Sequence, residues 1–151
     1  MRVALFEPDI PQNTGNIFRL SACWGVEIDI IGPTGFIFDD KRFKRSSMDY
    51  FEHAKYRKHL DWKSFKNWSS ENNYRLILLT TKAKESYLDF KFQQNDILLF
   101  GRESAGVPES VHDKVDKKIK IPIKKKLRSI NLSSAVAIVT GEACRQLNLF
   151  L

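Results

Sequence analysis

Three short polar segments carry the side chains best suited to chemistry in this chain of 151 residues. They are residues 13–19, 101–106 and 121–131. A guanidinium at Arg19 could hold a phosphate or a developing negative charge. The carboxylate of Glu103 can accept hydrogen bonds from hydroxyl or ammonium groups. Each segment alone also fits a structural role, because Asn13 and Asn131 are good helix caps and glycines are common in loops.

Apolar runs predict the elements that position these segments. Strands are expected at residues 3–6, 26–31, 55–59, 74–81, 96–100 and 118–123. Helices are expected at 13–24, 39–47, 61–68 and 131–147. The expected caps are Asn13 or Thr14 for the first helix and Asp39 or Asp40 for the second, and Gly25 is expected to end the first. Strands that are apolar on both faces and alternate with helices indicate a mostly parallel α/β sheet with helices on both faces. In such sheets, binding sites lie in the loops after the strands.

The net charge of +7 is concentrated in two segments. Residues 41–66 have a balance of +6 and residues 114–128 a balance of +7, which leaves −6 for the rest of the chain. Localised positive charge fits a nucleic acid partner, and a solvated lysine-rich surface is the alternative. Aromatic residues interleaved with the first segment favour RNA, because exposed rings stack on unpaired bases, although most of these rings are expected in the core.

Composition disfavours several other classes of protein. No apolar run reaches the roughly 18 to 20 residues of a membrane span, and the N-terminus is unlike a secretory signal, so we expect a cytoplasmic location and no membrane contact. Cys23 and Cys144 are expected to be free buried thiols, and no metal site is indicated. The missing glycine-rich fingerprint disfavours a Rossmann-type nucleotide-binding enzyme. The length fits one domain, residues 1–151, without an extra RNA-binding domain.

Taken together, the three segments resemble the motifs of the SPOUT-class RNA methyltransferases, in particular the subgroup that 2′-O-methylates the wobble nucleotide of tRNA. Residues 7–16 with Arg19 resemble the first motif. Residues 35–36, 39–42 and 49–50 resemble the wobble subgroup, and residues 79–82, 100–108 and 121–133 resemble the remaining motifs. The resemblance covers nearly the whole chain. Departures from it include Gly141, where close relatives carry a bulky aromatic residue.

The resemblance implies a fold and a cofactor that periodicity does not reveal. The fold is a single-domain SPOUT fold whose C-terminal segment passes through a loop to form a deep trefoil knot. The implied cofactor is S-adenosyl-L-methionine, bound mainly through backbone groups of the knot loops. The residues that match cofactor contacts are Leu79, Thr80, Gly101, Ile121, Ile123, Ser129, Ile130 and Leu132.

The resemblance also implies a reaction. It is methylation of the ribose 2′-hydroxyl of nucleotide 34, cytidine or uridine, in tRNA, with leucine isoacceptors as the expected substrates. The matching catalytic residues are Arg19, Asn13, Glu103, Ser129 and Asn131. Because arginine keeps its proton at neutral pH, we expect Arg19 to act as an electrostatic clamp on the hydroxyl and an RNA phosphate rather than as a base. That phosphate, Ser129 or Asn131 would then help the proton leave.

The anticodon arm of tRNA is the implied partner. Its expected contacts are Arg19, Lys41, Arg42, Lys44, Arg45, Lys124, Lys125, Lys126 and Arg128. The last predicted helix is apolar almost all round, so we expect a homodimer through the first and last helices. The alternative function is a catalytically idle SPOUT-fold protein that binds RNA. The presence of Arg19, Glu103, Ser129 and Asn131 argues against that alternative.

Overall fold

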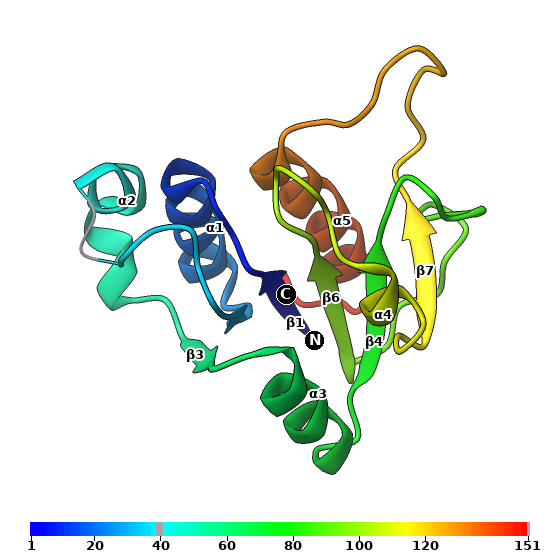
Figure 1. Cartoon of the computed structure of the whole chain (residues 1–151), viewed down its shortest axis with the longest axis horizontal. Coiled ribbons are helices and arrows are strands. Elements are labelled where there is room, and N and C mark those ends of the chain that lie inside the picture. The colour runs from blue at the N-terminus through cyan, green and yellow to red at the C-terminus, as the bar shows by residue number, and fades with distance from the viewer. Residues whose placement is uncertain (39–40, 151) are drawn as a thin grey trace.

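The computed structural model describes residues 1–38 and 41–150 (Figure 1). Its strands are β1 Arg2–Phe6, β2 Glu27–Ile31, β3 Tyr56–His59, β4 Arg75–Leu79, β5 Glu85–Ser86, β6 Asp96–Phe100 and β7 Lys117–Lys120. Its helices are α1 Pro11–Trp24, α2 Lys41–Ser47, the 3-10 helix η1 Met48–Glu52, α3 Trp62–Glu71, α4 Glu109–His112 and α5 Leu132–Gln146. The described strands form one sheet of seven, in the order β3-β2-β1-β6-β4-β7-β5, with every neighbouring pair parallel. The predicted parallel α/β sheet is confirmed.

Helices cover both faces of this sheet, as predicted. Leu5 of β1 belongs to an apolar cluster with residues of α1 and α5, such as Val136. The next residue, Phe6, belongs to a second cluster with Phe65 of α3 and Val111 of α4. Successive side chains of a strand point to opposite faces, so β1 is buried between two layers of helices. The carboxyl ends of the central strands are left free to border a site.

Helix α1 begins earlier than the sequence predicted. Pro11 is its first residue, where a fixed φ favours the helix and no amide hydrogen is needed, and Ile10 precedes it without a side-chain cap. The prediction that Asn13 or Thr14 caps this helix is therefore wrong, because both lie inside its first turns and are buried. The predicted stop is confirmed, since Gly25 has a φ of 67°, which glycine adopts without strain.

Other helix starts follow the expected capping chemistry. The carboxylate of Asp61 accepts a hydrogen bond from the backbone amide of Ser64 at 2.8 Å and so begins α3. Asn131 begins α5, and its Oδ1 accepts from the amides of Ser133 and Ser134 at 2.9 and 3.3 Å. The predicted caps of α2, at residues 39 and 40, lie outside the described residues.

Two strands end earlier than their apolar patterns suggested. β4 ends at Leu79 rather than at residue 81, and β7 ends at Lys120 rather than at residue 123. Pro122 has no amide hydrogen and cannot extend a ladder of hydrogen bonds. The segments that follow both strands instead line the cavity described below.

A buried ionic network joins the first three strands at the side of the sheet away from that cavity. The Asp29 carboxylate is fully buried and accepts from Arg2 Nε at 2.6 Å, and its second oxygen lies 2.7 Å from His59 Nε2. Arg2 also pairs with the half-exposed Glu27. The Arg2 guanidinium lies over the ring of Trp68, 5.2 Å from its centre. Each charge in this network has a partner, as burial requires.

The two cysteines have different environments. Cys144 is buried in α5, as predicted, whereas Cys23 is exposed on α1, so the prediction of two buried thiols is wrong for Cys23.

No helix within the described ranges has the length and apolar character to cross a membrane. Among the same residues, no cluster of three or more His, Cys, Asp or Glu side chains forms a potential metal site.

Candidate cofactor and catalytic site

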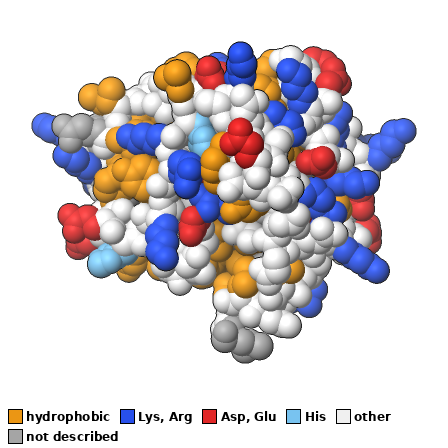
Figure 2. Space-filling view, turned by 90° about the horizontal axis from the view of Figure 1, so that it is seen from below, with side chains coloured by type: hydrophobic (Ala, Val, Ile, Leu, Met, Phe, Trp, Pro, Cys, Tyr) orange, Lys and Arg blue, Asp and Glu red, His pale blue; other side chains and the backbone are white. Residues whose placement is uncertain are grey.

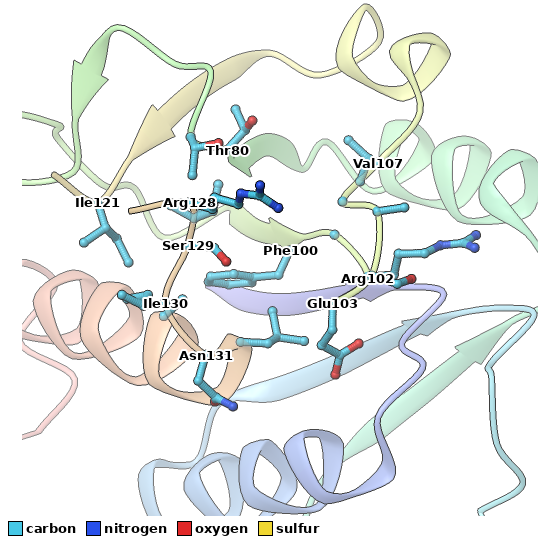
Figure 3. Close-up of a pocket in the computed structure, with 18 of the residues that line it drawn as sticks. Thr80, Phe100, Arg102, Glu103, Val107, Ile121, Arg128, Ser129, Ile130 and Asn131 are labelled. Atoms are coloured by element: carbon cyan, nitrogen blue, oxygen red, sulfur yellow. The ribbon is translucent and has the colours of Figure 1, made fainter. Parts of the chain in front are cut away.

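A cavity of about 630 Å³ lies at the carboxyl ends of β4 and β6 and extends under the segment between β7 and α5 (Figure 3). Cavities of 300 to 1,000 Å³ are the usual size for cofactor and small-molecule sites. The position agrees with the general rule for open parallel sheets. All three polar segments singled out in the sequence contribute residues to its lining.

Every residue predicted to contact the cofactor lines this cavity: Leu79, Thr80, Gly101, Ile121, Ile123, Ser129, Ile130 and Leu132. Ile121 and Ile130 lie together on one side in Figure 3. That side is apolar, whereas Glu103 and Asn131 provide polar groups beside α1. The cavity therefore has one wall suited to a flat apolar ring and another suited to hydrogen bonding.

Gly101 shapes the loop that borders the cavity. The loop turns back on itself, because the amides of Arg102 and Gly106 each donate to the other's carbonyl oxygen, at 3.1 and 2.8 Å. A Cβ built on Gly101 would lie 2.5 Å from the carbonyl carbon of Gly106, a distance that real contacts do not reach. Any side chain at this position would open the loop, so the close approach requires glycine.

A chain of hydrogen bonds links the three polar segments. Asn13 Nδ2 donates to Glu103 Oε1 at 3.1 Å, and Asn131 Nδ2 donates to Asn13 Oδ1 at 2.9 Å. Asn13 was free to enter this network because it does not cap α1. The structure therefore brings together three of the predicted catalytic residues, from segments about 90 and 118 positions apart in sequence.

Asp9 is a member of this cluster that sequence reasoning missed. Its amide donates to Glu103 Oε2 at 3.0 Å, and its own carboxylate accepts from the hydroxyl of Ser104. Burial and the neighbouring Asp9 carboxyl raise the pKa of Glu103 above its ordinary value, while the contact with Glu103 and the Ser104 hydroxyl lower the pKa of Asp9. The sequence shows Asp9 only as an acidic residue in the first polar loop, because its partner Glu103 lies 94 residues away.

Arg19 does not reach the cavity in the protomer. It is exposed on α1, where its guanidinium lies over the ring of Tyr50, 5.2 Å from the centre, and Nη1 lies 3.6 Å from Met48 Sδ. Its neighbours belong to η1, on the side of α1 away from α5 (Figure 1). The structure thus separates Arg19 from Asn13, although the two share a helix.

Apart from Arg19, the predicted RNA-binding residues lie in two exposed groups. Lys41, Arg42, Lys44 and Arg45 are on α2, and Lys124, Lys125, Lys126 and Arg128 are on the segment between β7 and α5. Figure 1 places these groups on either side of the α1 and α5 pair. Arg128 also lines the cavity, and its guanidinium extends toward the space between Thr80 and Phe100 (Figure 3). On the face shown in Figure 2, Lys and Arg side chains are interspersed with acidic and hydrophobic ones.

His112 is a second cavity residue that the sequence did not single out. It ends α4, is 5% exposed and lines the cavity. Its lack of metal-ligand spacing gave no reason to select it, and the short α4 was not predicted. Only the fold brings this side chain to the cavity.

A cavity of cofactor size at the ends of the central strands is the arrangement by which open parallel α/β sheets bind ligands. The model of the SpoU rRNA Methylase family matches residues 1–141. The chain belongs to this family.

Similar proteins cover nearly the whole chain. A tRNA (cytidine(34)-2′-O)-methyltransferase of Beijerinckia indica is 49% identical over 95% of this chain and 90% of the relative. The protein of the same name from Escherichia coli K12 is 44% identical over 97% of this chain and 94% of its own length. A solved structure from work on the 2-OH methylation of C/U34 on tRNA has a TM-score of 0.92 at 35% identity, covering 97% of this chain and 95% of the other.

Proposed function

We propose that this protein is an S-adenosyl-L-methionine-dependent tRNA (cytidine/uridine(34)-2′-O)-methyltransferase. The names of its relatives at 44 to 49% identity support the reaction, the tRNA and the nucleotide position. One structural observation carries the assignment to this chain. The eight expected cofactor contacts line one cavity, and the hydrogen-bonded Asn13, Glu103 and Asn131 lie at its edge.

The residues of the cavity fit the proposed cofactor. Its apolar wall, formed with Leu79, Ile121 and Ile130, suits an adenine ring, and its volume of about 630 Å³ is in the range for a molecule of this size. Gly101 lines the cavity without a side chain, so the loop backbone can lie close to a ligand there. When bound, S-adenosylmethionine supplies a methyl group on a positively charged sulfur.

The chain's own residues would prepare the ribose hydroxyl for the methyl group. Asn13 is held between Glu103 and Asn131, so this network fixes the polar edge of the cavity before the RNA arrives. Arg19 would bind the RNA phosphate beside the reacting hydroxyl and favour its ionised form through positive charge. The phosphate, Ser129 or Asn131 would help the proton leave.

A homodimer through α1 and α5 is part of this proposal. Ile138 on α5 is 40% exposed, and Phe150 beyond that helix is 52% exposed and packs on Trp24 of α1. These side chains give the paired helices an apolar surface that a second copy would bury. Arg19 does not reach the cavity of its own protomer. A second copy would bring its own Arg19 and basic residues near that cavity.

The remaining parts of the proposal concern the RNA and the chain. The basic groups on α2 and on residues 124–128 would bind the anticodon arm, because both are exposed and strongly positive. We further propose leucine isoacceptors as substrates, a cytoplasmic location, a deep trefoil knot at the C-terminal segment, and a single SPOUT domain over residues 1–151.

Mapping 2′-O-methyl groups in tRNA from cells with and without this protein tests the proposal. The expected result is loss of the modification at nucleotide 34 of leucine tRNAs alone, restored by the wild-type chain. Unchanged tRNA modification, together with retained RNA binding by the purified protein, would instead support a catalytically idle RNA-binding protein.

Gly101→Ala is expected to weaken binding of S-adenosylhomocysteine at least tenfold. The new methyl group would overlap the backbone of Gly106 and open the loop that borders the cavity. Isothermal titration calorimetry measures the change. Gly25→Ala, at a glycine away from the cavity, is the control and should leave the affinity unchanged in the folded protein. Equal affinity of Gly101→Ala and wild type would show that the loop is not part of the cofactor site.

Asn131 is expected to have two separable roles. Asn131→Ala removes the cap of α5 and should lower the free energy of unfolding by about 1 kcal/mol. Asn131→Asp keeps the capping oxygen but loses the donor to Asn13 Oδ1. It should therefore retain most of the stability while slowing methyl transfer. Urea denaturation and single-turnover rates measure the two effects, and equal rates for Asn131→Asp and wild type would remove the link to Asn13 from the mechanism.

A further inference from the structure

The imidazole of His112 is buried, lines the cavity and has no hydrogen-bond partner among residues 1–38 and 41–150. Both imidazole nitrogens keep some accessible surface, because neither is among the fully buried polar atoms that lack a hydrogen-bond partner. The side chain is 5% exposed and lines the cavity, so a ligand in the cavity could reach it. Buried polar groups are nearly always hydrogen-bonded, so this histidine is ready for a ligand atom.

The fold brings His112 to the cavity from the face of the sheet opposite to α5. Val111, the residue before it, packs on the face of the sheet covered by α3 and α4, while Leu132 and Ala135 reach the cavity from α5 on the opposite face. The amide of His112 donates to the carbonyl oxygen of Pro108 at 3.2 Å, which fixes the end of α4. The imidazole thus enters from a rigid element.

The cavity has three sides with different chemistry. Figure 3 shows Glu103 and Asn131 beside α1, Ile121 and Ile130 on an apolar side, and Thr80 and Val107 on a third side. His112 ends α4, the short helix that follows Val107 in the chain, and it also lines the cavity, so we assign it to this third side.

On the third side, Thr80 offers a hydroxyl group and His112 an imidazole, and the Arg128 guanidinium extends toward the space between Thr80 and Phe100 (Figure 3). Thr80 Oγ1 accepts from the amide of Lys82 at 3.3 Å, which leaves its hydroxyl proton free to donate. The Lys82 ammonium lies 3.7 Å from Glu109, and both side chains are more than 70% exposed. A neutral imidazole both donates and accepts, as does a hydroxyl group. The two hydroxyls of a sugar diol can exchange hydrogen bonds with both of these groups.

We propose that His112, with Thr80, binds the ribose hydroxyls of the cofactor. This inference rests on the proposed function. The apolar side is suited to the adenine, and the side bearing Asn13, Glu103 and Asn131 is reserved for the reacting methyl group. The ribose joins the adenine to the sulfur, so the third side is left for it. His112 would then be a binding residue that holds the ribose, the part of the cofactor between the adenine and the sulfur.

Binding of S-adenosylhomocysteine and its 2′-deoxy and 3′-deoxy ribose analogues, measured by calorimetry, tests this inference. In the wild type, removing the hydroxyl that His112 contacts should weaken binding about three- to tenfold, as one neutral hydrogen bond does. His112→Leu should bind S-adenosylhomocysteine three- to tenfold more weakly and should no longer distinguish it from that deoxy analogue. His112→Gln, which can still donate and accept, should recover part of the affinity and discrimination.

Two controls separate this inference from simpler effects. His53→Leu changes an exposed histidine outside the cavity and should bind all three compounds like the wild type. Melting temperatures without ligand identify any loss of folding in His112→Leu. If that variant does not fold, the affinity and discrimination of His112→Gln decide the result. Wild-type affinity in His112→Leu, or unchanged discrimination against both deoxy analogues, would overturn the assignment of the ribose to His112. Failure of the wild type to bind S-adenosylhomocysteine would overturn the proposed cofactor itself.

Discussion

Arg19→Lys is expected to lower the single-turnover rate of tRNA methylation by about 100- to 1,000-fold. Preorganised groups that stabilise a developing oxyanion commonly have effects of this size. Lysine keeps the positive charge but cannot form the planar, two-pronged contact through which a guanidinium would hold a phosphate and the reacting hydroxyl together. The loss should therefore appear in the rate at saturating tRNA, with tRNA affinity changed far less.

Arg57→Lys is the matched control for this experiment. Arg57 is an exposed arginine on the edge strand β3, it lies over the ring of Trp68, and it is not among the proposed site residues. Its substitution should leave the rate near that of the wild type. Near-normal turnover of Arg19→Lys would exclude the guanidinium clamp. Weaker tRNA binding with an unchanged saturating rate would reduce Arg19 to an RNA anchor.

Asp29→Ala is expected to lower the free energy of unfolding by about 3–5 kcal/mol, the usual effect of removing one partner from a buried ion pair. Asp29 is fully buried between Arg2 and His59, so the substitution leaves both without their shared acceptor. Urea denaturation of the purified protein measures the loss. The Arg2 guanidinium cannot become neutral, and its remaining partner Glu27 is 44% exposed, so its burial without Asp29 is costly.

Glu27→Ala provides the comparison for Asp29. Glu27 pairs with the same arginine, but its side chain is 44% exposed, so its removal should change the free energy of unfolding by less than about 1 kcal/mol. A loss of the same size for both variants, or a loss below 1 kcal/mol for Asp29→Ala, would contradict the view that burial makes Asp29 essential to the first three strands.

Local patterns predicted the framework of the fold well. The continuous apolar run at 96–100 matches β6, and strands that are apolar on both faces predicted a sheet buried on both sides. Boundaries were less predictable. Residues 80–81 and 121–123 are as apolar or as β-prone as the strands before them, yet they leave the sheet to form the cavity.

The site was predictable only where its residues matched a family pattern. The cofactor contacts were placed from that resemblance, and all of them line the cavity. Asp9, Asp29 and His112 were missed, because each acquires its environment from long-range packing. Asp29 contacts His59 from 30 residues away, and Asp9 contacts Glu103 from 94 residues away. Hydrophobic periodicity predicts which face of a helix or strand is buried. It does not predict which distant side chain packs against that face.

Methylation of synthetic tRNA with a single altered ribose tests the central claim most directly. Purified protein would receive S-adenosylmethionine with a labelled methyl group and a leucine tRNA that carries ribose, 2′-deoxyribose or 2′-O-methylribose at nucleotide 34. A tRNA with 2′-deoxyribose at nucleotide 33 is the control. We predict that label enters the unmodified tRNA and the control, and enters neither tRNA altered at nucleotide 34. Equal labelling of all four tRNAs, or labelling of none, would contradict the account.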